Sequence, residues 1–264
     1  MMVVFTDLDG TLLDHKTHSF EPALRALERL RELEIPVVLV TSKTFPEVDF
    51  WRRELNNRSP FIVENGGAVF APKEGPRLPK EAARPYEEYE MVEFGVPYGD
   101  LTAALKAAAS ESGCRVLGFA DMSVREVSRI CQFSLEQAAM AKARRYDEAF
   151  ELIEGRVEAL QRAVEQRGMK LTRGGRFFHI TGHNNKVDGV LLLIRAYRQL
   201  GGIQTIGIGD GPNDTGFLNV VDHAVLIDSP LAGELHKRVP RAHAAASGPG
   251  GWNEAVLELL GCRE

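Results

Sequence analysis

The stretch that decides the fold is MVVFTDLDGT at residues 2–11. Its first half is short, apolar and rich in β-branched side chains, which is typical of a buried strand. The strand ends abruptly in two carboxylates, Asp7 and Asp9, followed by Gly10. Because binding loops lie at the carboxyl ends of the strands in parallel sheets, this pattern predicts a functional loop directly after the first strand.

Strand and helix patterns alternate outward from this stretch. A helical pattern begins near residue 20, and residues 35–40 form a second apolar strand-like run. Thr44 and Glu47 have the form of a capping box that opens another helix. The alternation returns after residue 185, with a helix to residue 200 and an apolar run over residues 203–208. We therefore predict an α/β fold with a doubly wound parallel sheet.

The middle of the chain has a different pattern. Residues 72–85 are rich in Pro, Lys, Glu, Gly and Arg, which is typical of a linker. Strands and helices without the α/β alternation follow, beginning with a strand near residues 89–94. We predict a core formed by residues 1–82 and 181–264 and an inserted α+β cap formed by residues 83–180.

The composition limits the classes of function. A formal net charge of -5 over 264 residues does not provide the basic face that nucleic-acid binding usually needs. The three cysteines form no CxxC pair, and no apolar run reaches the roughly 18 residues of a membrane span. We expect a cytoplasmic protein that acts on a small molecule. A homodimer is compatible with the sequence, but no feature selects it.

Acidic residues gather at the ends of two predicted strands. Asp7 and Asp9 follow the first, and Asp210 and Asp214 follow the strand over residues 203–208. Either pair alone is equally compatible with solvated turn residues. Together they indicate one acidic cavity, where a hard cation such as Mg²⁺ would offset the repulsion between like charges.

Four motifs occur in order along the chain. The first is Asp7-Leu8-Asp9-Gly10-Thr11, the second is Thr41 at the end of an apolar run, the third is Lys186, and the fourth is formed by Gly209, Asp210, Asn213 and Asp214. This order and spacing resemble the haloacid dehalogenase superfamily of phosphohydrolases over the whole predicted core. The resemblance implies a phosphatase that uses Mg²⁺ and acts through an aspartyl-phosphate.

The resemblance also implies roles for these residues. Asp7 attacks phosphorus, while Asp9 protonates the leaving oxygen and later activates water. Asp7, the Asp9 carbonyl and Asp210 bind Mg²⁺, and Thr41 and Lys186 stabilise the transferred phosphoryl group. Further candidates at the phosphate or beside the site are Ser42, Lys43, Asn65, Gly66, Asn213 and Asp214. General-acid chemistry near neutral pH requires a proton on Asp9, so we expect acidic neighbours to raise its pKa.

The predicted cap carries candidate substrate-binding residues. They are Lys142, Arg144, Arg176 and His179. The local sequences around them resemble a family of phosphatases that act on mannosyl-3-phosphoglycerate and form mannosylglycerate. Arginine presents a planar fork that suits the carboxylate of such a substrate. Judged without the resemblance, the same cations would be assigned to solvated surface.

Other functions share this set of motifs. Phosphatases for other sugar phosphates or small phosphorylated metabolites have the same core chemistry, and a phosphomutase also forms an aspartyl-phosphate. A non-catalytic phosphate or metal sensor could retain the fold. The intact pair of Asp7 and Asp9 argues against a sensor, because binding alone needs no acid-base residue.

Overall fold

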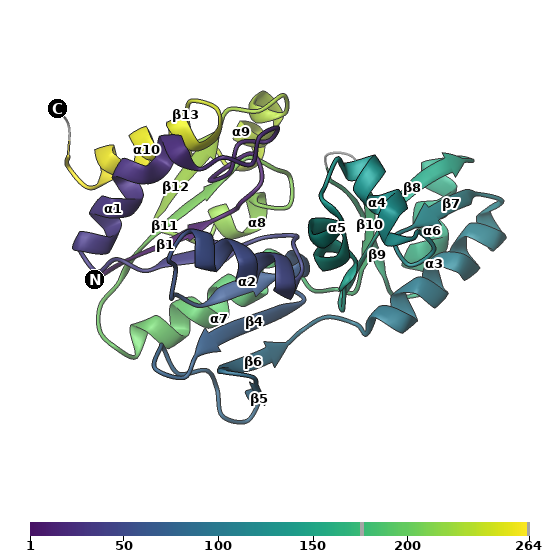
Figure 1. Ribbon diagram of the computed structural model, residues 1–264, viewed down its shortest axis with the longest axis horizontal. Helices are drawn as coiled ribbons and strands as arrows, with labels where there is room; N and C mark the ends of the chain where they lie inside the picture. The colour runs from purple at the N-terminus through teal and green to yellow at the C-terminus, as the bar shows by residue number, and fades with distance from the viewer. Residues whose placement is uncertain (175–176, 263–264) are drawn as a thin grey trace.

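The computed structural model describes residues 1–174 and 177–262. Figure 1 shows two lobes, a larger core that holds both the first and the last described elements and a smaller cap formed by the middle of the chain. The lobes are joined by two short segments, residues 94–97 and 182–185. The α/β core and the inserted cap predicted from the sequence are confirmed.

The core is built on a nine-stranded sheet. The strands, in their spatial order, are β13 (His243–Ala245), β12 (His223–Ile227), β11 (Gln204–Gly209), β1 (Met2–Thr6), β2 (Val37–Val40), β3 (Phe61–Val63), β4 (Ala68–Pro72), β6 (Tyr89–Glu93) and β5 (Arg84–Tyr86). The first six run parallel, while β4, β6 and β5 are added antiparallel. β1 lies between β2 and β11, so the loops after these three strands meet at one edge.

Helices cover both faces of this sheet, as the doubly wound prediction requires. One face packs against α1 (Leu24–Glu32), α2 (Phe45–Glu54) and α10 (Gly248–Leu259), and the other against α7 (Lys186–Arg198), α8 (Thr215–Leu218) and α9 (Ala232–Arg238). Alternation along β1 divides its side chains between the two layers, with Val4 in the first and Val3 and Phe5 in the second. Two short 3-10 turns complete the core, η1 (Glu21–Ala23) and η2 (Glu64–Gly66).

The cap is a four-stranded antiparallel sheet with helices on both faces. Its strands, in spatial order, are β7 (Arg115–Gly118), β8 (Asp147–Glu154), β10 (Phe178–Thr181) and β9 (Lys170–Arg173). The outer face packs on α3 (Tyr98–Ser112) and α6 (Val157–Glu165), and the inner face on α4 (Val124–Cys131) and α5 (Leu135–Lys142). Figure 1 shows α5 on the side of the cap that faces the core.

Two strands belong to the core sheet and not to the cap, where the sequence boundary would place them. β5 and β6 fall after residue 82, on the cap side of the predicted boundary, yet both extend the core sheet through β4. The Pro- and Gly-containing residues 72–85 thus connect β4 to β5 within one sheet, where both strands pair antiparallel with β6. Strand pairing is a tertiary property, so composition alone does not distinguish this connection from a linker between domains.

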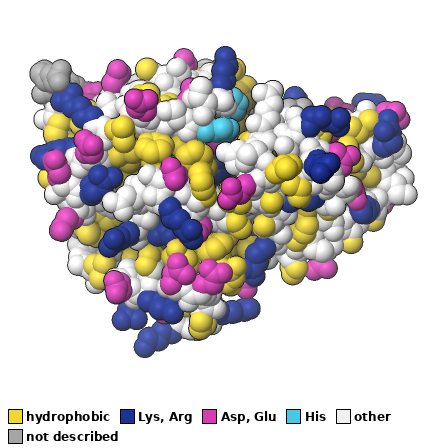
Figure 2. All heavy atoms as spheres, viewed as in Figure 1, with side chains coloured by type: hydrophobic (Ala, Val, Ile, Leu, Met, Phe, Trp, Pro, Cys, Tyr) yellow, Lys and Arg dark blue, Asp and Glu magenta, His cyan; other side chains and the backbone are white. Residues whose placement is uncertain are grey.

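None of the helices in the described part of the chain is long and apolar enough to cross a membrane. Figure 2 shows charged side chains of both signs on both lobes, with a constriction where the lobes meet. The cavities that matter lie at this junction.

Candidate active site

Asp7 stands at the centre of the edge where the parallel strands end. It follows β1 directly and is 8% exposed. Its backbone N–H donates to the carbonyl of Ile208 on β11 at 2.9 Å, which fixes the start of the loop. Thr41, at the end of β2, is buried beside it. The strand order therefore places the first two motifs next to each other.

Lys186 connects the first and fourth motifs. Its ammonium group donates to Oδ1 of Asp7 at 2.7 Å and to Oδ1 of Asp214 at 2.7 Å. The side chain is 1% exposed at the first position of α7, where Asn185 caps the helix by accepting from the N–H of Asp188. Burial would lower the pKa of this lysine, but the two carboxylates raise it. Lys186 is therefore a permanent cation in the site.

Asp214 shapes the loop that carries Asp210. Its Oδ2 accepts from the N–H groups of Asp210 at 3.1 Å and Gly211 at 2.9 Å. Thr11 donates its hydroxyl to Oδ1 of Asp210 at 2.9 Å, so the first loop also orients this carboxylate. Gly10 has a φ of +79°, and a Cβ there would lie 2.5 Å from Oδ2 of Asp210. The glycine lets the two acidic loops approach closely.

The acidic residues fit a hard divalent cation. Asp7, Asp210 and Asp214 each offer a carboxylate oxygen, and these oxygens lie within 4.8 Å of one another. Burial, together with acidic neighbours, raises the pKa of Asp7 well above its usual range and that of Asp210 to about 6. Such carboxylates are stabilised as anions when a cation binds, and an oxygen-only donor set favours Mg²⁺.

Asp9 differs from what the sequence predicts. We expect acidic neighbours to raise its pKa, and this expectation is wrong. Burial works in that direction, but the Lys43 ammonium, 2.9 Å from Oδ2, outweighs it and lowers the pKa of Asp9. Its other oxygen, Oδ1, is buried without a hydrogen-bond partner among the described residues and lies 3.7 Å from Nδ1 of His18.

The segment after β2 is fixed by local hydrogen bonds. The Thr41 hydroxyl oxygen accepts from the N–H of Lys43 at 3.2 Å. Thr44 and Glu47 form the predicted capping box at the start of α2, which is confirmed. Thr44 also donates its hydroxyl to the carbonyl of Met140 in the cap, at 2.8 Å. The segment that follows Thr41 thus contacts the cap as well as the core.

The turn between β3 and β4 completes the core side. Glu64, Asn65 and Gly66 all have positive φ angles, of 46°, 56° and 86°. A Cβ on Gly66 would lie 1.9 Å from the carbonyl oxygen of Asn185, so only glycine allows the turn to pack against the start of α7. Asn65 accepts from Nδ2 of Asn213 at 3.0 Å, which links this turn to the fourth motif.

A cleft of about 150 Å³ lies between the core and the cap. The core contributes Asp9, Ser42 and Lys43 to its lining, and the cap contributes Arg144 and His179. The wall between them is apolar and includes Phe119, Phe133, Ala149 and Phe177. Asp9 and two of the predicted cap residues, Arg144 and His179, therefore face the same space.

Lys142, another predicted cap residue, is not among the described residues that line this cleft. Lys142 donates its ammonium group to the carbonyls of Phe119 and Met122, so it ties down a cap turn instead of lining the cleft. Arg176 lies outside the described residues.

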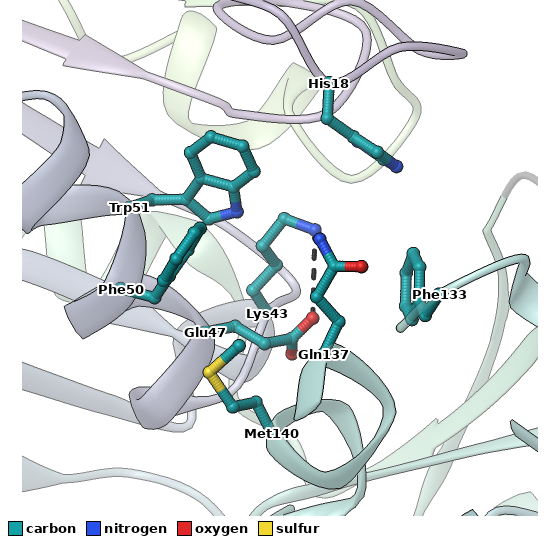
Figure 3. Close-up of a pocket in the computed structure, with 8 residues that line it drawn as sticks. All are labelled: His18, Lys43, Glu47, Phe50, Trp51, Phe133, Gln137 and Met140. Atoms are coloured by element: carbon teal, nitrogen blue, oxygen red, sulfur yellow. Dashed lines mark ion pairs between the residues drawn. The ribbon is translucent and has the colours of Figure 1, made fainter. Parts of the chain in front are cut away.

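A second, smaller pocket adjoins the cleft on the side of α2. Figure 3 shows His18 and Trp51 from the core and Phe133 and Met140 from the cap around it, with Lys43 in its wall. The rings of His18 and Phe133 lie 6.0 Å apart between centroids. The sequence gives no signal for this pocket, because its aromatic residues come from separate elements.

Two further acidic residues at the junction are also missing from the sequence prediction. Glu64 is fully buried and accepts from the N–H groups of Arg145 at 2.9 Å and Tyr146 at 2.8 Å. Asp147 is fully buried and contacts Arg144 and His179. Asp and Glu are rarely buried, so sequence patterns assign such residues to the surface.

Comparison with known sequences places this geometry in a family. The profile of the haloacid dehalogenase-like hydrolases matches residues 4–92. Two relatives named glucosyl-3-phosphoglycerate/mannosyl-3-phosphoglycerate phosphatase are similar over 98% of this chain and 97% of their own length. The protein from Methanococcoides burtonii is 38% identical, and that from Persephonella marina 35%. A mannosyl-3-phosphoglycerate phosphatase from Pyrococcus furiosus is 32% identical over 85% of this chain and 90% of its own.

Solved structures support the fold. A subclass IIB sugar phosphatase of the same superfamily matches with a TM-score of 0.67, 18% identity and complete coverage of both chains. The sucrose-phosphatase from Synechocystis in complex with sucrose and phosphate matches with a TM-score of 0.62 and 14% identity over 97% of each chain. The family profile and the sequence relatives show that the chain is a phosphatase of the haloacid dehalogenase-like hydrolase family.

Proposed function

We propose that this phosphatase hydrolyses mannosyl-3-phosphoglycerate to mannosylglycerate and phosphate, with Mg²⁺ as cofactor and Asp7 as nucleophile. The glucosyl compound is the second substrate to test, because two relatives carry both substrates in their names. The observation that carries the proposal is the shared cleft, where Asp9 and Lys43 of the core face Arg144 and His179 of the cap.

The first half-reaction begins at Asp7. A carboxylate oxygen of Asp7 forms a bond to phosphorus as the ester P–O bond breaks, and Asp9 gives its proton to the departing glycerate oxygen. In the second half-reaction Asp9 takes a proton from water, the water oxygen attacks phosphorus, and the bond to Asp7 breaks. Lys186 and the hydroxyl of Thr41 stabilise charge on the phosphoryl oxygens.

The metal site of the proposal combines the two acidic loops. Asp7, Asp210 and the carbonyl of Asp9 would hold Mg²⁺, which supplies charge neutralisation at the transferred phosphoryl group. Asp214 adds a third carboxylate to the same cluster and keeps the loop in shape through its backbone contacts.

Lys43 provides a way for Asp9 to gain its proton. In the structure its ammonium pairs with Asp9 and lowers the pKa of that carboxyl. A substrate phosphate entering the cleft competes for the same ammonium group, since Lys43 also lines this space. When Lys43 moves to the phosphate, burial becomes the dominant influence on Asp9 and favours its protonated form.

The cap is proposed to recognise the rest of the substrate. The guanidinium of Arg144 uses Nε and Nη2 for contacts to Ser42 and Asp147. None of the described residues accepts from its Nη1, and the side chain lines the cleft. An arginine that is held at two nitrogens and presents the third suits the carboxylate of a phosphoglycerate.

The test is phosphate release from a panel of phosphorylated metabolites with Mg²⁺ present. We expect the highest kcat/KM for mannosyl- or glucosyl-3-phosphoglycerate. Preference for another sugar phosphate would replace the substrate, formation of an isomeric phosphate would indicate a mutase, and no turnover on the panel would favour a sensor. The cytoplasmic location and the homodimer remain predictions.

A further inference from the structure

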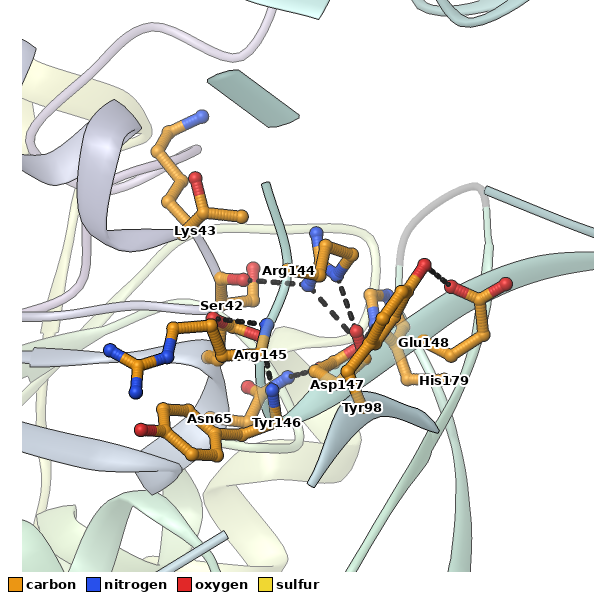
Figure 4. Close-up of polar contacts among 12 residues, drawn as sticks. Ser42, Lys43, Asn65, Tyr98, Arg144, Arg145, Tyr146, Asp147, Glu148 and His179 are labelled. Carbon is orange, nitrogen blue, oxygen red and sulfur yellow. Dashed lines mark hydrogen bonds and ion pairs between the residues drawn. The ribbon is translucent and has the colours of Figure 1, made fainter. Parts of the chain in front are cut away.

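Asp147 occupies a junction that the catalytic motifs do not include. It is the first residue of β8 and directly follows the segment that leads from α5 into the cap sheet. Its side chain is 0% exposed, yet Figure 4 shows it surrounded by polar groups from both lobes. A buried carboxylate is costly unless it is paired and hydrogen-bonded, so the identity of these partners decides what the residue does.

One carboxylate oxygen of Asp147 holds two cap side chains. Oδ1 lies 2.8 Å from Nδ1 of His179 and 3.2 Å from Nη2 of Arg144. Nε of Arg144 also donates to the backbone carbonyl of Asp147 at 2.6 Å. Both partners line the cleft that contains Asp9. The carboxylate therefore fixes the orientation of the two polar cap side chains that face a bound substrate.

The other oxygen reaches the core. Oδ2 accepts from Nδ2 of Asn65 at 2.7 Å, and Oδ1 of Asn65 accepts from Nδ2 of Asn213 at 3.0 Å. Asn213 belongs to the loop that carries Asp210. A continuous line of hydrogen bonds thus joins the catalytic loop to the cap side chains.

The same segment is attached to the core at two neighbouring points. Arg144 donates through Nη2 to the carbonyl of Ser42 at 3.0 Å, and Glu64 accepts from the N–H groups of Arg145 and Tyr146. Asp147 and Arg144 therefore both contact the core, Asp147 through Asn65 and Arg144 through Ser42. Burial opposes ionisation of Asp147, but His179 and Arg144 outweigh it and lower its pKa to about 2.

We propose that Asp147 is a positioning residue for substrate recognition. It holds Arg144 and His179 in the orientation that binds the carboxylate of the leaving group, and it couples them to the catalytic loop through Asn65. The inference deepens the proposed function and rests on it for the carboxylate-bearing class of substrate. It assigns recognition to a residue that does not itself contact the substrate.

The test uses Asp147→Asn, which keeps the shape and removes the charge, in the full chain with Mg²⁺. Two ligands are compared: 3-phosphoglycerate as a competitive inhibitor, which carries phosphate and carboxylate without a sugar, and phenyl phosphate as a substrate without a carboxylate. We expect the Ki for 3-phosphoglycerate to rise about 10- to 100-fold, the loss typical of a charge-assisted contact. The kcat/KM for phenyl phosphate should fall much less than the Ki for 3-phosphoglycerate rises, because phenyl phosphate has no carboxylate for Arg144 to bind.

A double-mutant cycle shows whether Asp147 acts through Arg144. Arg144→Gln should raise the Ki for 3-phosphoglycerate by a similar factor. Adding Asp147→Asn to Arg144→Gln should raise this Ki little further, because the guanidinium that Asp147 positions is already absent. Fully additive losses would overturn the positioning role. Glu154→Gln is the matched control, since Glu154 lies at the far end of the same strand and pairs with Arg115 at the surface. Glu154→Gln should change neither the Ki for 3-phosphoglycerate nor the kcat/KM for phenyl phosphate.

The inference and the proposed function fail in different ways. If wild type does not hydrolyse the glycosyl-3-phosphoglycerates, the proposed substrate is wrong. The Ki for 3-phosphoglycerate in wild type and Asp147→Asn then still tests the positioning role of Asp147. The inference is overturned if wild type binds 3-phosphoglycerate no better than inorganic phosphate. It is also overturned if Asp147→Asn leaves that Ki unchanged or impairs both ligands equally.

Should Asp147→Asn not fold, as judged by circular dichroism, Asp147→Glu takes its place. This variant keeps the charge but moves the carboxylate by one methylene. We then expect the Ki for 3-phosphoglycerate to rise by about fivefold or more, because small displacements of a positioning group are costly. An equal effect on phenyl phosphate contradicts the proposal.

Discussion

The acidic cluster of the core and Asp147 of the cap differ in how their buried charge is balanced. In the core, carboxylates crowd around Lys186, and burial and acidic neighbours raise the pKa of Asp7 and Asp210. In the cap, the carboxylate of Asp147 is paired with Arg144 and His179, and its pKa is lowered. The core site thus favours added positive charge, while the cap presents the guanidinium of Arg144 to the cleft. This contrast supports our proposal that the core performs chemistry and the cap recognises an anionic leaving group.

The largest effect should come from the nucleophile. Asp7→Asn replaces a carboxylate by an amide of nearly the same shape, so turnover of every substrate should fall by about 10⁴-fold or more. Phosphate release measures the loss, and circular dichroism checks that the fold is kept. Appreciable activity in a folded variant would show that Asp7 is not the nucleophile, and would contradict the proposal that the core site performs the chemistry.

Removal of the metal should come next in size. A chelator should stop hydrolysis of both glycosyl-3-phosphoglycerate and phenyl phosphate, and added Mg²⁺ should restore it. Ca²⁺ should restore it poorly, because its larger and looser coordination misplaces the attacking carboxylate. Full activity of protein shown by elemental analysis to be metal-free would contradict the assignment of Asp7 and Asp210 as ligands.

A smaller and selective effect is expected from the cap. Arg144→Gln should lower kcat/KM for glycosyl-3-phosphoglycerate by about 10- to 100-fold, the range for a lost charge-assisted hydrogen bond. Phenyl phosphate has no carboxylate for this guanidinium, so its kcat/KM should change little. Steady-state kinetics on both substrates provide the measurement. Similar losses on the two would mean that Arg144 supports the fold or the phosphate.

The junction between the lobes predicts a pH effect on stability. Burial raises the pKa of Glu64 from 4.5 to about 7. Between these values the folded state binds more protons than the unfolded state, so stability falls as pH rises. The shift corresponds to about 3 kcal/mol in the free energy of unfolding.

Glu64→Gln removes this titration and keeps an acceptor for the N–H groups of Arg145 and Tyr146. Urea unfolding from pH 4.5 to 7.5 should therefore show that wild type loses stability relative to Glu64→Gln over this range. Parallel pH profiles for the two proteins would show that Glu64 does not titrate in the folded state as described.

The core could be predicted from sequence because its signals are local. The apolar run before Asp7 and the capping box of Thr44 and Glu47 each reside within a few residues, and both appear in the structure. The spacing of the motifs also places Asp7, Lys186 and Asp214 together. Parallel strand order converts that local information into one site.

The parts that the sequence does not predict depend on tertiary contacts. Composition assigns β5 and β6 to the cap, whereas pairing with β4 keeps them in the core. Lys43 is expected at the phosphate, yet it pairs with Asp9 and reverses the expected pKa shift. Asp147 has no motif, and its role emerges only where β8 meets Asn65.

The claim that the core performs the chemistry and the cap recognises the substrate is tested most directly by comparing Asp9→Asn with Arg144→Gln on two substrates. Asp9→Asn should lower kcat/KM by a similar factor, about 10² to 10⁴, for glycosyl-3-phosphoglycerate and for an alkyl phosphate whose leaving group also needs a proton. Arg144→Gln should lower it only for the first. That pattern is the predicted result. Equal losses from both variants on both substrates would contradict the separation of chemistry from recognition.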